Sequence, residues 1–196
     1  MGIQERKQRE KAAMQKLILE TANSLFQQQG IEHVSIRNIA QEIEYSPATI
    51  YLYFKDKDEI LFYLTNSFLA EFEDKLKEFN FIKDHFSRLK NISQSWLDYA
   101  IYHPEKYQMI FLSKEKLQEN SLYQYLNDSV TQCIQNNQLQ RMPTTEASTI
   151  IISFLHGMSS LVINNKFNIQ SKSELLDHMS ELINRFLTNM KGYSLV

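Results

Sequence analysis

The stretch SIRNIAQEIEYSPATIYLYFKDKDEIL, residues 35–61, decides the fold of this chain. Residues 36–43 place their apolar side chains at the i, i+3, i+4, i+7 spacing of a helix that packs on a core. Ser35 can cap this helix. Ser46 can cap a second helix, and Pro47 fits its first turn because the missing N–H is not needed there. The second helix is expected to be about eight residues, or roughly 12 Å, long.

The second helix is too short to form a core of its own, but one or two of its turns fit a DNA major groove. It carries Thr49, Tyr51 and Tyr53, and Lys55 and Lys57 follow at once. Such hydroxyl, phenol and ammonium groups bond to phosphates and base edges. A third helix starts directly afterwards. The stretch therefore predicts a helix-turn-helix that binds DNA.

The composition of the whole chain indicates an all-α protein. Among 196 residues there are only 4 glycines and 3 prolines, and no Asn-Gly or Asp-Gly joins two hydrophobic runs as in a β-hairpin. Each proline stands where a helix can begin. The hydrophobic share of 43% and the aromatic share of 12% suffice for a sizeable core.

Apolar periodicity and capping residues predict about nine helices along the chain. The first precedes the helix-turn-helix and covers residues 4–29. Six helices are expected after it, at residues 57–79, 84–102, 104–112, 117–139, 143–164 and 171–192.

Charge is distributed unevenly along the chain. The net charge of −2 argues against polyanion binding by the chain as a whole, but residues 5–16 are locally basic. The cations there are Arg6, Lys7, Arg9, Lys11 and Lys16. This segment could reach DNA phosphates or a minor groove, or it could be a solvated terminus. The sequence leaves both alternatives open.

The sequence carries no sign of export, membrane insertion or disulfide formation. The N-terminus lacks the hydrophobic segment of a secretory signal, and no apolar run of about 18 residues is present, so no membrane span is expected. The single Cys133 excludes an internal disulfide and fits a reducing cytoplasm. We expect it to be a small buried hydrophobe rather than a redox sensor.

No catalytic or metal-binding motif is found. The five histidines never pair at i, i+3 or i+4, as a helical metal site requires. There is no G-x-S-x-G turn and no glycine-rich loop that could cradle a phosphate. We therefore expect no enzyme activity, no cofactor and no metal.

An extended motif covers the same region as the helix-turn-helix. An Ile-Arg-x-Ile-Ala helix is followed by a turn ending in Ser and by Thr-Ile-Tyr-x-Tyr-Phe-Lys-x-Lys-x-Glu-Ile-Leu. Residues 14–65, which contain it, resemble the N-terminal domain of the TetR family of bacterial transcriptional regulators. This part is about a quarter of the chain. Weaker patterns at residues 103–111 and 154–158 resemble the family's C-terminal domains.

The resemblance implies a mechanism and a division of the chain. Residues 1–56 would form the DNA-binding domain, and residues 57–196 a helical effector-binding and dimerisation domain. Two copies would dimerise through the last two helices and place their second short helices in successive major grooves, about 34 Å apart, on a near-palindromic operator. A small molecule in the C-terminal core would shift the helix that starts at Lys57 and release the DNA, so the protein would act as a cytoplasmic repressor.

The resemblance also assigns candidate DNA contacts. Thr49 could touch a base edge or a phosphate, and Ala48 and Leu52 could contact a thymine methyl group. Phosphates are the expected partners of Tyr51, Tyr53 and Lys55, with core packing as the alternative for Tyr53. Core packing is favoured for Phe54. The full set of candidates is Arg37, Ser46, Ala48, Thr49, Tyr51, Leu52, Tyr53, Lys55 and Lys57.

Two positions depart from the family pattern. Glu44 and Tyr45 stand where the family usually has Gly-Val, and Pro47 and Ala48 stand where it often has Lys-Gly. If Glu44 takes a left-handed conformation, it costs roughly a kcal/mol that glycine would avoid. The carboxylate would also bring negative charge to the DNA side, and the proline removes one expected phosphate contact.

The C-terminal part is rich in aromatic residues, which suits an apolar or flat effector, including a cationic one. Ordinary core filling is the alternative for each of them. The candidates for effector contact are Phe68, Trp96, Tyr99, Phe111, Tyr123 and His156. Gly157, next to His156, would let another helix approach closely, at a pocket wall or in a dimer.

Two other classes of function were weighed against a ligand-responsive repressor. An all-α enzyme lacks any nucleophile, base or metal cluster in this sequence. A helical adaptor that binds only protein leaves the Thr-Ile-Tyr-x-Tyr-Phe-Lys motif unexplained. Loss of DNA binding on substitution of Tyr51 or Lys55 distinguishes the first class from the other two.

Overall fold

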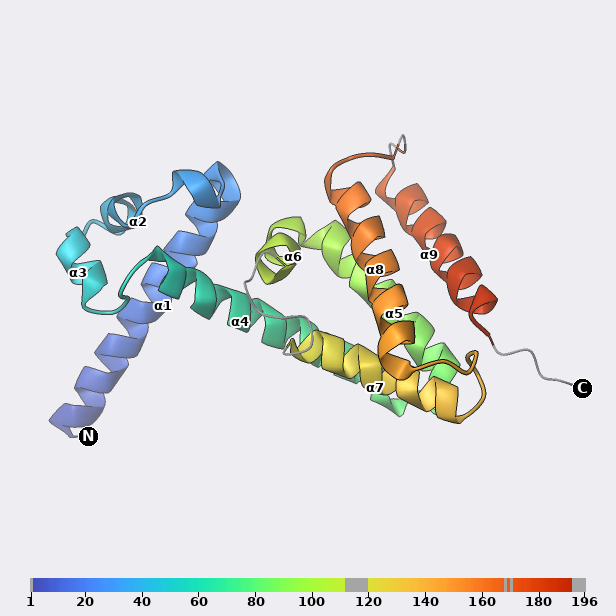
Figure 1. Ribbon diagram of the computed structural model, residues 1–196. Helices are drawn as coiled ribbons and strands as arrows, with labels where there is room; N and C mark the ends of the chain where they lie inside the picture. Colours follow the sequence, from blue (N-terminus) through green and yellow to red (C-terminus); the bar gives the residue numbers. More distant parts are fainter. Residues whose placement is uncertain (1, 112–119, 168, 170, 192–196) are drawn as a thin grey trace, which may run out of the picture. The chain divides into compact units, whose positions relative to one another are not determined.

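The structure is a computed structural model, which describes residues 2–111, 120–167, 169 and 171–191 (Figure 1). Within these residues the chain forms nine α-helices and two short 3₁₀ helices, and no strand. The all-α prediction is therefore confirmed. The chain divides into two compact units, here called the N-terminal unit (Met1–Phe68) and the C-terminal unit (Leu69–Val196). This division lies within helix α4, whereas the domain boundary at residues 56 and 57 stays a prediction.

The N-terminal unit is a small bundle around the helix-turn-helix. Its elements are α1 (Ile3–Gln29), η1 (Ile31–His33), α2 (Ile36–Glu42), α3 (Pro47–Tyr51) and the first part of α4 (Lys57–Lys77). Helix α1 packs against α2, and α2 packs against α3. The inner side chains of these helices, among them Ile18, Ile39 and Ile50, are fully buried. Together they fix the short helices α2 and α3, which are too short to be stable alone.

Serine caps begin both helices of the helix-turn-helix. The Ser35 hydroxyl accepts from the Asn38 amide at 3.3 Å, and the Ser46 hydroxyl accepts from the Thr49 amide at 3.2 Å. Helix α3 ends at Tyr51, so it is shorter than the expected length of about eight residues. It ends early because the Leu52 and Tyr53 amides bond to carbonyls three residues back, which tightens the chain into a turn.

Three helices end in the same way, with a residue in the left-handed region. Glu44, Asn137 and Asn165 have φ values of 59°, 54° and 51°. Each follows a helix and is flanked by the paired 5→2 and 6→1 hydrogen bonds of a Schellman motif, as in Glu44 N to Gln41 O and Tyr45 N to Ala40 O. Asparagine tolerates this conformation, whereas glutamate does so at a cost.

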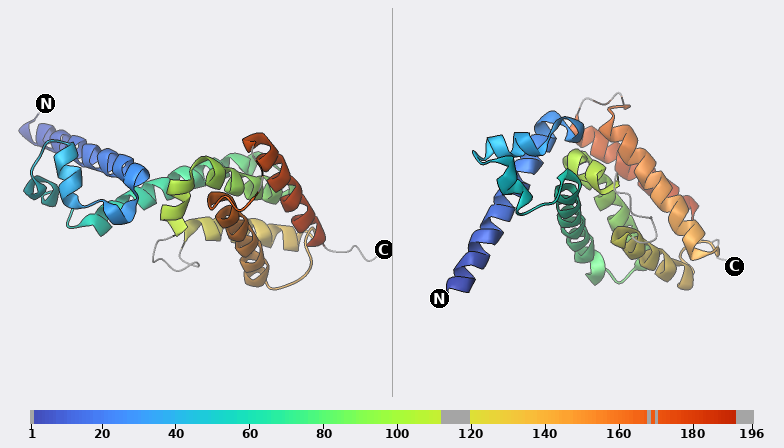
Figure 2. Two further views of the ribbon diagram at one scale, coloured as in Figure 1. Left: turned by 90° about the horizontal axis from the view of Figure 1, so that it is seen from above. Right: turned by 60° about the vertical axis from the view of Figure 1, so that its left-hand side comes forward.

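The C-terminal unit is built around one central helix. Its elements are the rest of α4, η2 (Glu78–Phe81), α5 (His85–Tyr102), α6 (Pro104–Phe111), α7 (Ser121–Gln135), α8 (Thr144–Ile163) and α9 (Lys172–Asn189). Helix α5 contacts η2, α6, α7, α8 and α9 (Figures 1 and 2). Leu89, Ile92, Trp96 and Leu97 of α5 are fully buried. The core of this unit therefore lies along α5.

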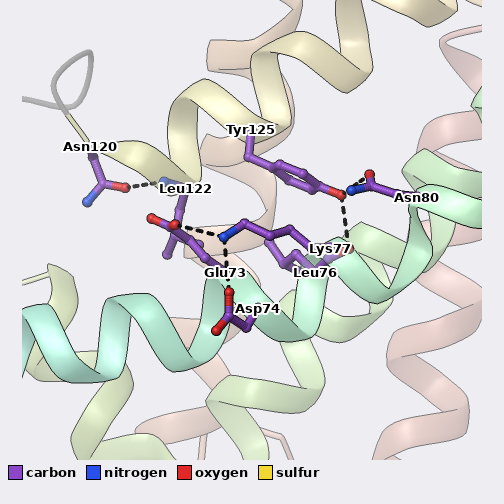
Figure 3. A network of polar contacts seen from close by, with 8 residues as sticks. All are labelled: Glu73, Asp74, Leu76, Lys77, Asn80, Asn120, Leu122 and Tyr125. Carbon is purple, nitrogen blue, oxygen red and sulfur yellow. Dashed lines mark hydrogen bonds and ion pairs between the residues drawn. The ribbon is translucent and has the colours of Figure 1, made fainter.

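Polar contacts fasten helix α7 to the end of α4 (Figure 3). The Tyr125 hydroxyl lies 3.0 Å from the Leu76 carbonyl oxygen and 2.8 Å from Asn80 Oδ1. Asn120 caps α7 by accepting from the Leu122 amide at 3.0 Å. Cys133, on the same helix, is buried, and burial raises the pKa of its thiol to about 12. The thiol therefore stays protonated and unreactive at neutral pH.

The helix boundaries agree with the sequence prediction to within a few residues. Helix α4 gives way to the 3₁₀ helix η2 at Glu78, where one continuous helix was expected. Helix α7 ends at Gln135, four residues before Leu139, where its end was expected. The expected end of α6 at Leu112, the start of α7 at Leu117 and the end of α9 at Gly192 lie outside the described residues.

Helix α8 is long and apolar enough, with 20 residues and a mean hydropathy of 1.4, to cross a membrane by length and composition. The expectation of no membrane span, drawn from uninterrupted apolar runs, stays a prediction. Serines and Gly157 break the run, but the mean remains high. In the C-terminal unit α8 packs against α5 and α7, with Ile151, Ile152 and Leu155 buried. Core helices of this kind meet the same criterion.

Candidate DNA-binding surface and aromatic cluster

The end of helix α3 exposes large side chains to solvent. Tyr51 is 56% exposed and Leu52 is 76% exposed, although both are large enough to prefer burial. Lys55 and Arg37 are exposed as well. A phenol, an isobutyl group, an ammonium and a guanidinium thus lie on the surface of one helix-turn-helix. These groups suit phosphates and thymine methyl groups.

Buried neighbours hold this surface in place. Ile50 is 0% exposed and Phe54 is 1% exposed, and the Phe54 ring packs edge-on against Tyr63 with centroids 5.6 Å apart. Because Ile50 and Phe54 point inward on the same turn, Tyr51 and Leu52 between them point outward. The core role favoured for Phe54 in the sequence agrees with its burial.

The remaining candidate DNA contacts differ in their surroundings. Ser46 and Ala48 are exposed, while Thr49 and Tyr53 are half-buried. The Thr49 hydroxyl lies 3.0 Å from the Ser46 hydroxyl. The Lys57 ammonium donates to the Ile31 carbonyl oxygen at 3.0 Å, so in this structure it fastens α4 to η1. Contact of these five residues with DNA stays a prediction.

Replacing Glu44 with glycine is expected to stabilise the N-terminal unit. Glutamate at φ 59° costs about 1–2 kcal/mol, and the greater flexibility of unfolded glycine offsets about 0.5–1 kcal/mol of the gain. The net rise in unfolding free energy should lie between about 0 and 1.5 kcal/mol, measured by urea unfolding. Glu44→Gln, which removes the charge and keeps the side chain, is the control. Equal effects of both variants would contradict an explanation based on the backbone.

Aromatic side chains of four helices meet in the C-terminal unit. Phe72 of α4 stacks on Tyr99 with centroids 4.2 Å apart and lies 5.5 Å from Trp96. Phe111 lies 5.5 Å from Trp96 and 5.0 Å from His156 of α8. Tyr107 of α6 completes the group, 4.4 Å from Phe111. We call these six residues, Phe72, Trp96, Tyr99, Tyr107, Phe111 and His156, the aromatic cluster.

A chain of hydrogen bonds runs through the aromatic cluster. Trp96 Nε1 donates to the Tyr107 hydroxyl at 3.1 Å, and the same hydroxyl lies 3.1 Å from His156 Nδ1. Because indole is only a donor, the Tyr107 oxygen accepts from Trp96 and its own proton is free for His156. Burial raises the pKa of Tyr107 to about 12 and lowers the pKa of His156. Neutral His156 therefore accepts at Nδ1.

The structure brings together four of the six candidate effector contacts. Trp96, Tyr99, Phe111 and His156 belong to the aromatic cluster. Tyr123 is buried elsewhere in the C-terminal unit, and Phe68 is buried at the end of the N-terminal unit. Tyr107 and Phe72 were missing from the candidate set, although Tyr107 and Phe111 stand at i and i+4 after Pro104. That spacing was a signal for a shared helix face.

A surface cavity of about 380 Å³ lies beside one member of this cluster. Its lining consists of Glu71, Asp74, Lys75, Glu78, Tyr99 and His103. The cavity falls in the size range of small-molecule sites, but four of its six lining residues are charged. Lys106 bridges to Glu71 at 2.7 Å. Among the described residues no cluster of three or more potential metal ligands is found.

Comparison with known proteins identifies the N-terminal part. Residues 18–64 match the family model of bacterial regulatory proteins, tetR family. The chain carries a TetR-family N-terminal domain. This confirms the resemblance seen in the helix-turn-helix motif.

Curated relatives of this TetR domain are HTH-type transcriptional regulators of Staphylococcus aureus. One, from strain MRSA252, is 31% identical over 115 residues, covering 56% of this chain and 60% of the relative. Another, from strain bovine RF122 / ET3-1, is 33% identical over 84 residues, covering 43% and 44%. The chain thus spans about half the length of the curated relatives it matches. TetR regulators are not enzymes, in line with the lack of a catalytic motif.

Solved structures share the fold over most of the chain. A protein of unknown function from Rhodococcus sp. RHA1 has a TM-score of 0.72 at 17% identity, covering 89% of this chain and 95% of that one. The fatty acid degradation regulator FadR from Bacillus halodurans has a TM-score of 0.66 at 19% identity, covering 86% and 93%. These likenesses concern the fold alone. Together with the match of residues 18–64, these structures show that the chain has a TetR-like fold.

Acidification is expected to destabilise the C-terminal unit of this TetR fold. The pKa of His156 is lowered by burial, and that of His103 by burial and by the charge of Lys106. Below the ordinary value of 6.5, the unfolded chain therefore binds more protons than the folded one, and the unfolding free energy falls as pH falls towards the folded pKa values. His156→Gln, which cannot titrate, should show a smaller loss in urea unfolding. If the unfolding free energy of parent and variant fell equally with pH, this explanation would be wrong.

Proposed function

We propose that this chain is a homodimeric TetR-family transcriptional regulator that represses its target genes and is released from DNA by a small hydrophobic or aromatic effector. The observation that carries the proposal is the exposure of Tyr51, Leu52 and Lys55 beside the buried Ile50 and Phe54. The buried Ile50 and Phe54 fix the orientation of this surface, and Leu52 on it is 76% exposed. DNA is the partner that such a surface fits.

Each group on the surface has a proposed role. Tyr51, Lys55 and Arg37 bind phosphates and fix the register of α3 on the duplex. Leu52 and Ala48 contact thymine methyl groups, and Thr49, held by Ser46 at 3.0 Å, bonds to a base edge or a phosphate. Tyr53 and Lys57 contribute phosphate contacts from the edge of the surface.

A homodimer through α8 and α9 would present two such surfaces to a near-palindromic operator. The outer face of α8 exposes Ile150 (41%) and Leu161 (43%), with Ser153 and Gly157 exposed between them. A Cβ atom at Gly157 would meet nothing within 4 Å, so the face is open to the close approach of another helix. Phe154 stacks on Phe186 of α9 at 4.0 Å, which joins the two helices in one protomer.

The aromatic cluster is the proposed effector site. It offers ring faces for a flat apolar molecule, and its Trp96–Tyr107–His156 hydrogen-bond chain offers one polar group to fix the orientation of that molecule. An effector that inserts between these rings displaces α4, which carries Phe72, and α4 begins directly after the DNA-binding surface. Release of DNA requires the effector to bind the displaced conformation more tightly.

Selection of DNA duplexes from a random library by the purified protein tests the proposal. We expect one near-palindromic sequence to be enriched and to give a discrete gel shift that weakens with salt, and size-exclusion chromatography to give a dimer. A reporter gene behind the selected duplex should be repressed. Failure to enrich any sequence, with no bound small molecule detected by mass spectrometry of the denatured protein, would overturn it and favour a helical protein-binding adaptor.

A further inference from the structure

The first eleven residues of helix α1 project from the rest of the N-terminal unit. Every described side chain from Gln4 to Ala13 is exposed, and burial begins only at Met14 and Gln15. At 1.5 Å per residue, residues 3–13 add about 16 Å of helix. In Figure 1 helix α3 lies beside the middle of α1, and the N-terminal end of α1 runs on past it. Nothing in the unit's core requires the extension.

Helical geometry places Lys7 and Lys11 of this extension on the same face of α1 as the buried residues that follow. Lys7 and Lys11 stand eleven residues before Ile18 and Ala22, and eleven residues are about three turns plus 20°. Ile18 and Ala22 are both 0% exposed and face the interior of the unit, where α1 packs against α2. Lys7 and Lys11 therefore continue the inward-facing stripe of α1 beyond the core.

The cations in the first half of α1 differ in their ion pairs. Arg6 bonds to Glu10 at 2.8 Å and Lys16 lies 3.6 Å from Glu20. Among the described residues, Lys7 and Lys11 belong to no ion pair. In an amphipathic helix this stripe would be apolar. Two ammonium groups on it, without carboxylate partners, fit a polyanion that runs along the same side as α3.

We propose that Lys7 and Lys11 bind phosphates of the DNA that flanks the segment contacted by α3. The proposal rests on the proposed function, because α3 must first place the unit on the duplex. It assigns the basic N-terminal segment a fixed helical geometry, with one face towards DNA and the opposite face in solvent. The extension thereby lengthens the footprint of each protomer without adding base contacts.

The test compares two variants with equal charge loss on opposite faces of α1. Lys7→Gln/Lys11→Gln removes the proposed contacts, and Arg9→Gln/Lys16→Gln removes two exposed cations about 180–200° around the helix from Lys7. Binding of each protein to the duplex selected by the parent is measured as a function of salt. For a dimer, the slope of log K against log salt should fall by about 3.6 for the first variant, or 0.9 for each of four phosphate contacts. The control should change the slope by less than one contact.

The outcomes separate this inference from the proposed function. A parent protein that selects no duplex contradicts the proposed function. If the parent binds its duplex, two results overturn the inference and leave the proposed function standing. In one, Lys7→Gln/Lys11→Gln keeps the parental salt slope. In the other, both variants lower the slope equally. Circular dichroism of both variants should match the parent, because all four substituted side chains are exposed.

Discussion

Replacing Tyr51 or Lys55 with alanine is expected to weaken binding to the selected duplex by about 1–3 kcal/mol at each half-site. A symmetric dimer loses both contacts at once, so the total is about twice that, or roughly 30-fold to more than 10,000-fold in affinity. Tyr51 is 56% exposed and Lys55 is exposed, so neither supports the core of the N-terminal unit. The measurement is a gel shift or fluorescence anisotropy titration at fixed salt.

Two controls separate lost contact from lost structure. Phe54→Ala removes a 1% exposed ring from the same turn and should lower the unfolding free energy by about 3–5 kcal/mol, whereas Tyr51→Ala should leave it within about 0.5 kcal/mol of the parent. Tyr102→Ala removes a 51% exposed tyrosine of the C-terminal unit and should leave DNA affinity unchanged. Parental affinity of Tyr51→Ala and Lys55→Ala, with the dimer intact, would place the DNA contacts elsewhere.

Local signals in the sequence predict where most helices begin. Serine or aspartate caps α2, α3, α5 and α9, and each accepts the hydrogen bond from the backbone that its position implies. Such caps act within four residues, so one sequence contains all the information they need. Helix ends are harder to predict: α3 ends at Tyr51 because the Leu52 and Tyr53 amides bond to carbonyls three residues back. The left-handed conformation of Glu44, with a φ of 59°, could be anticipated because Glu44 stands where the motif usually has glycine.

The exposure of Tyr51 and Leu52 beside the buried Ile50 and Phe54 could be predicted, since alternate exposure and burial on one short helix follows from helical geometry. Lys57 shows what helical geometry alone leaves out: its ammonium donates to the carbonyl oxygen of Ile31, a residue 26 positions away in sequence. The hydrophobic periodicity of α4 cannot predict a contact with a residue of η1. The same limit explains why DNA contact at each position stays a prediction.

The sequence predicts that aromatic residues gather in the C-terminal part, but not which of them belong to the aromatic cluster. Phe72, Trp96, Tyr107 and His156 come from α4, α5, α6 and α8, and the sequence alone cannot show which aromatic residues of four helices face one another. The i, i+4 spacing of Tyr107 and Phe111 indicates a shared helix face, but it does not show that Tyr107 is 1% exposed and bonds to both Trp96 and His156. The charged cavity beside Tyr99 depends on tertiary structure in the same way.

Replacing Trp96 with alanine is expected to have the largest effect in the C-terminal unit. The side chain is 0% exposed, contacts Phe72 and Phe111 and donates to Tyr107. Its loss leaves a cavity in the centre of the unit and should lower the unfolding free energy by about 3–5 kcal/mol. Urea unfolding followed by circular dichroism measures this. A loss below about 1 kcal/mol would mean that the aromatic cluster is not a packed core.

Tyr107→Phe isolates the hydrogen bonds from the packing. The ring remains, but Trp96 Nε1 loses its acceptor and His156 Nδ1 its donor, which should cost about 1–3 kcal/mol. Trp96→Phe/Tyr107→Phe removes both partners of the first bond, so its cost should be less than the sum of the single costs. Trp96 is the sole tryptophan, so its fluorescence in the parent and in Tyr107→Phe reports on this cluster alone. A bound effector should change that fluorescence, and Tyr107→Phe should weaken effectors that bond to the hydroxyl. Additive single costs would show that the bond contributes nothing to the cluster.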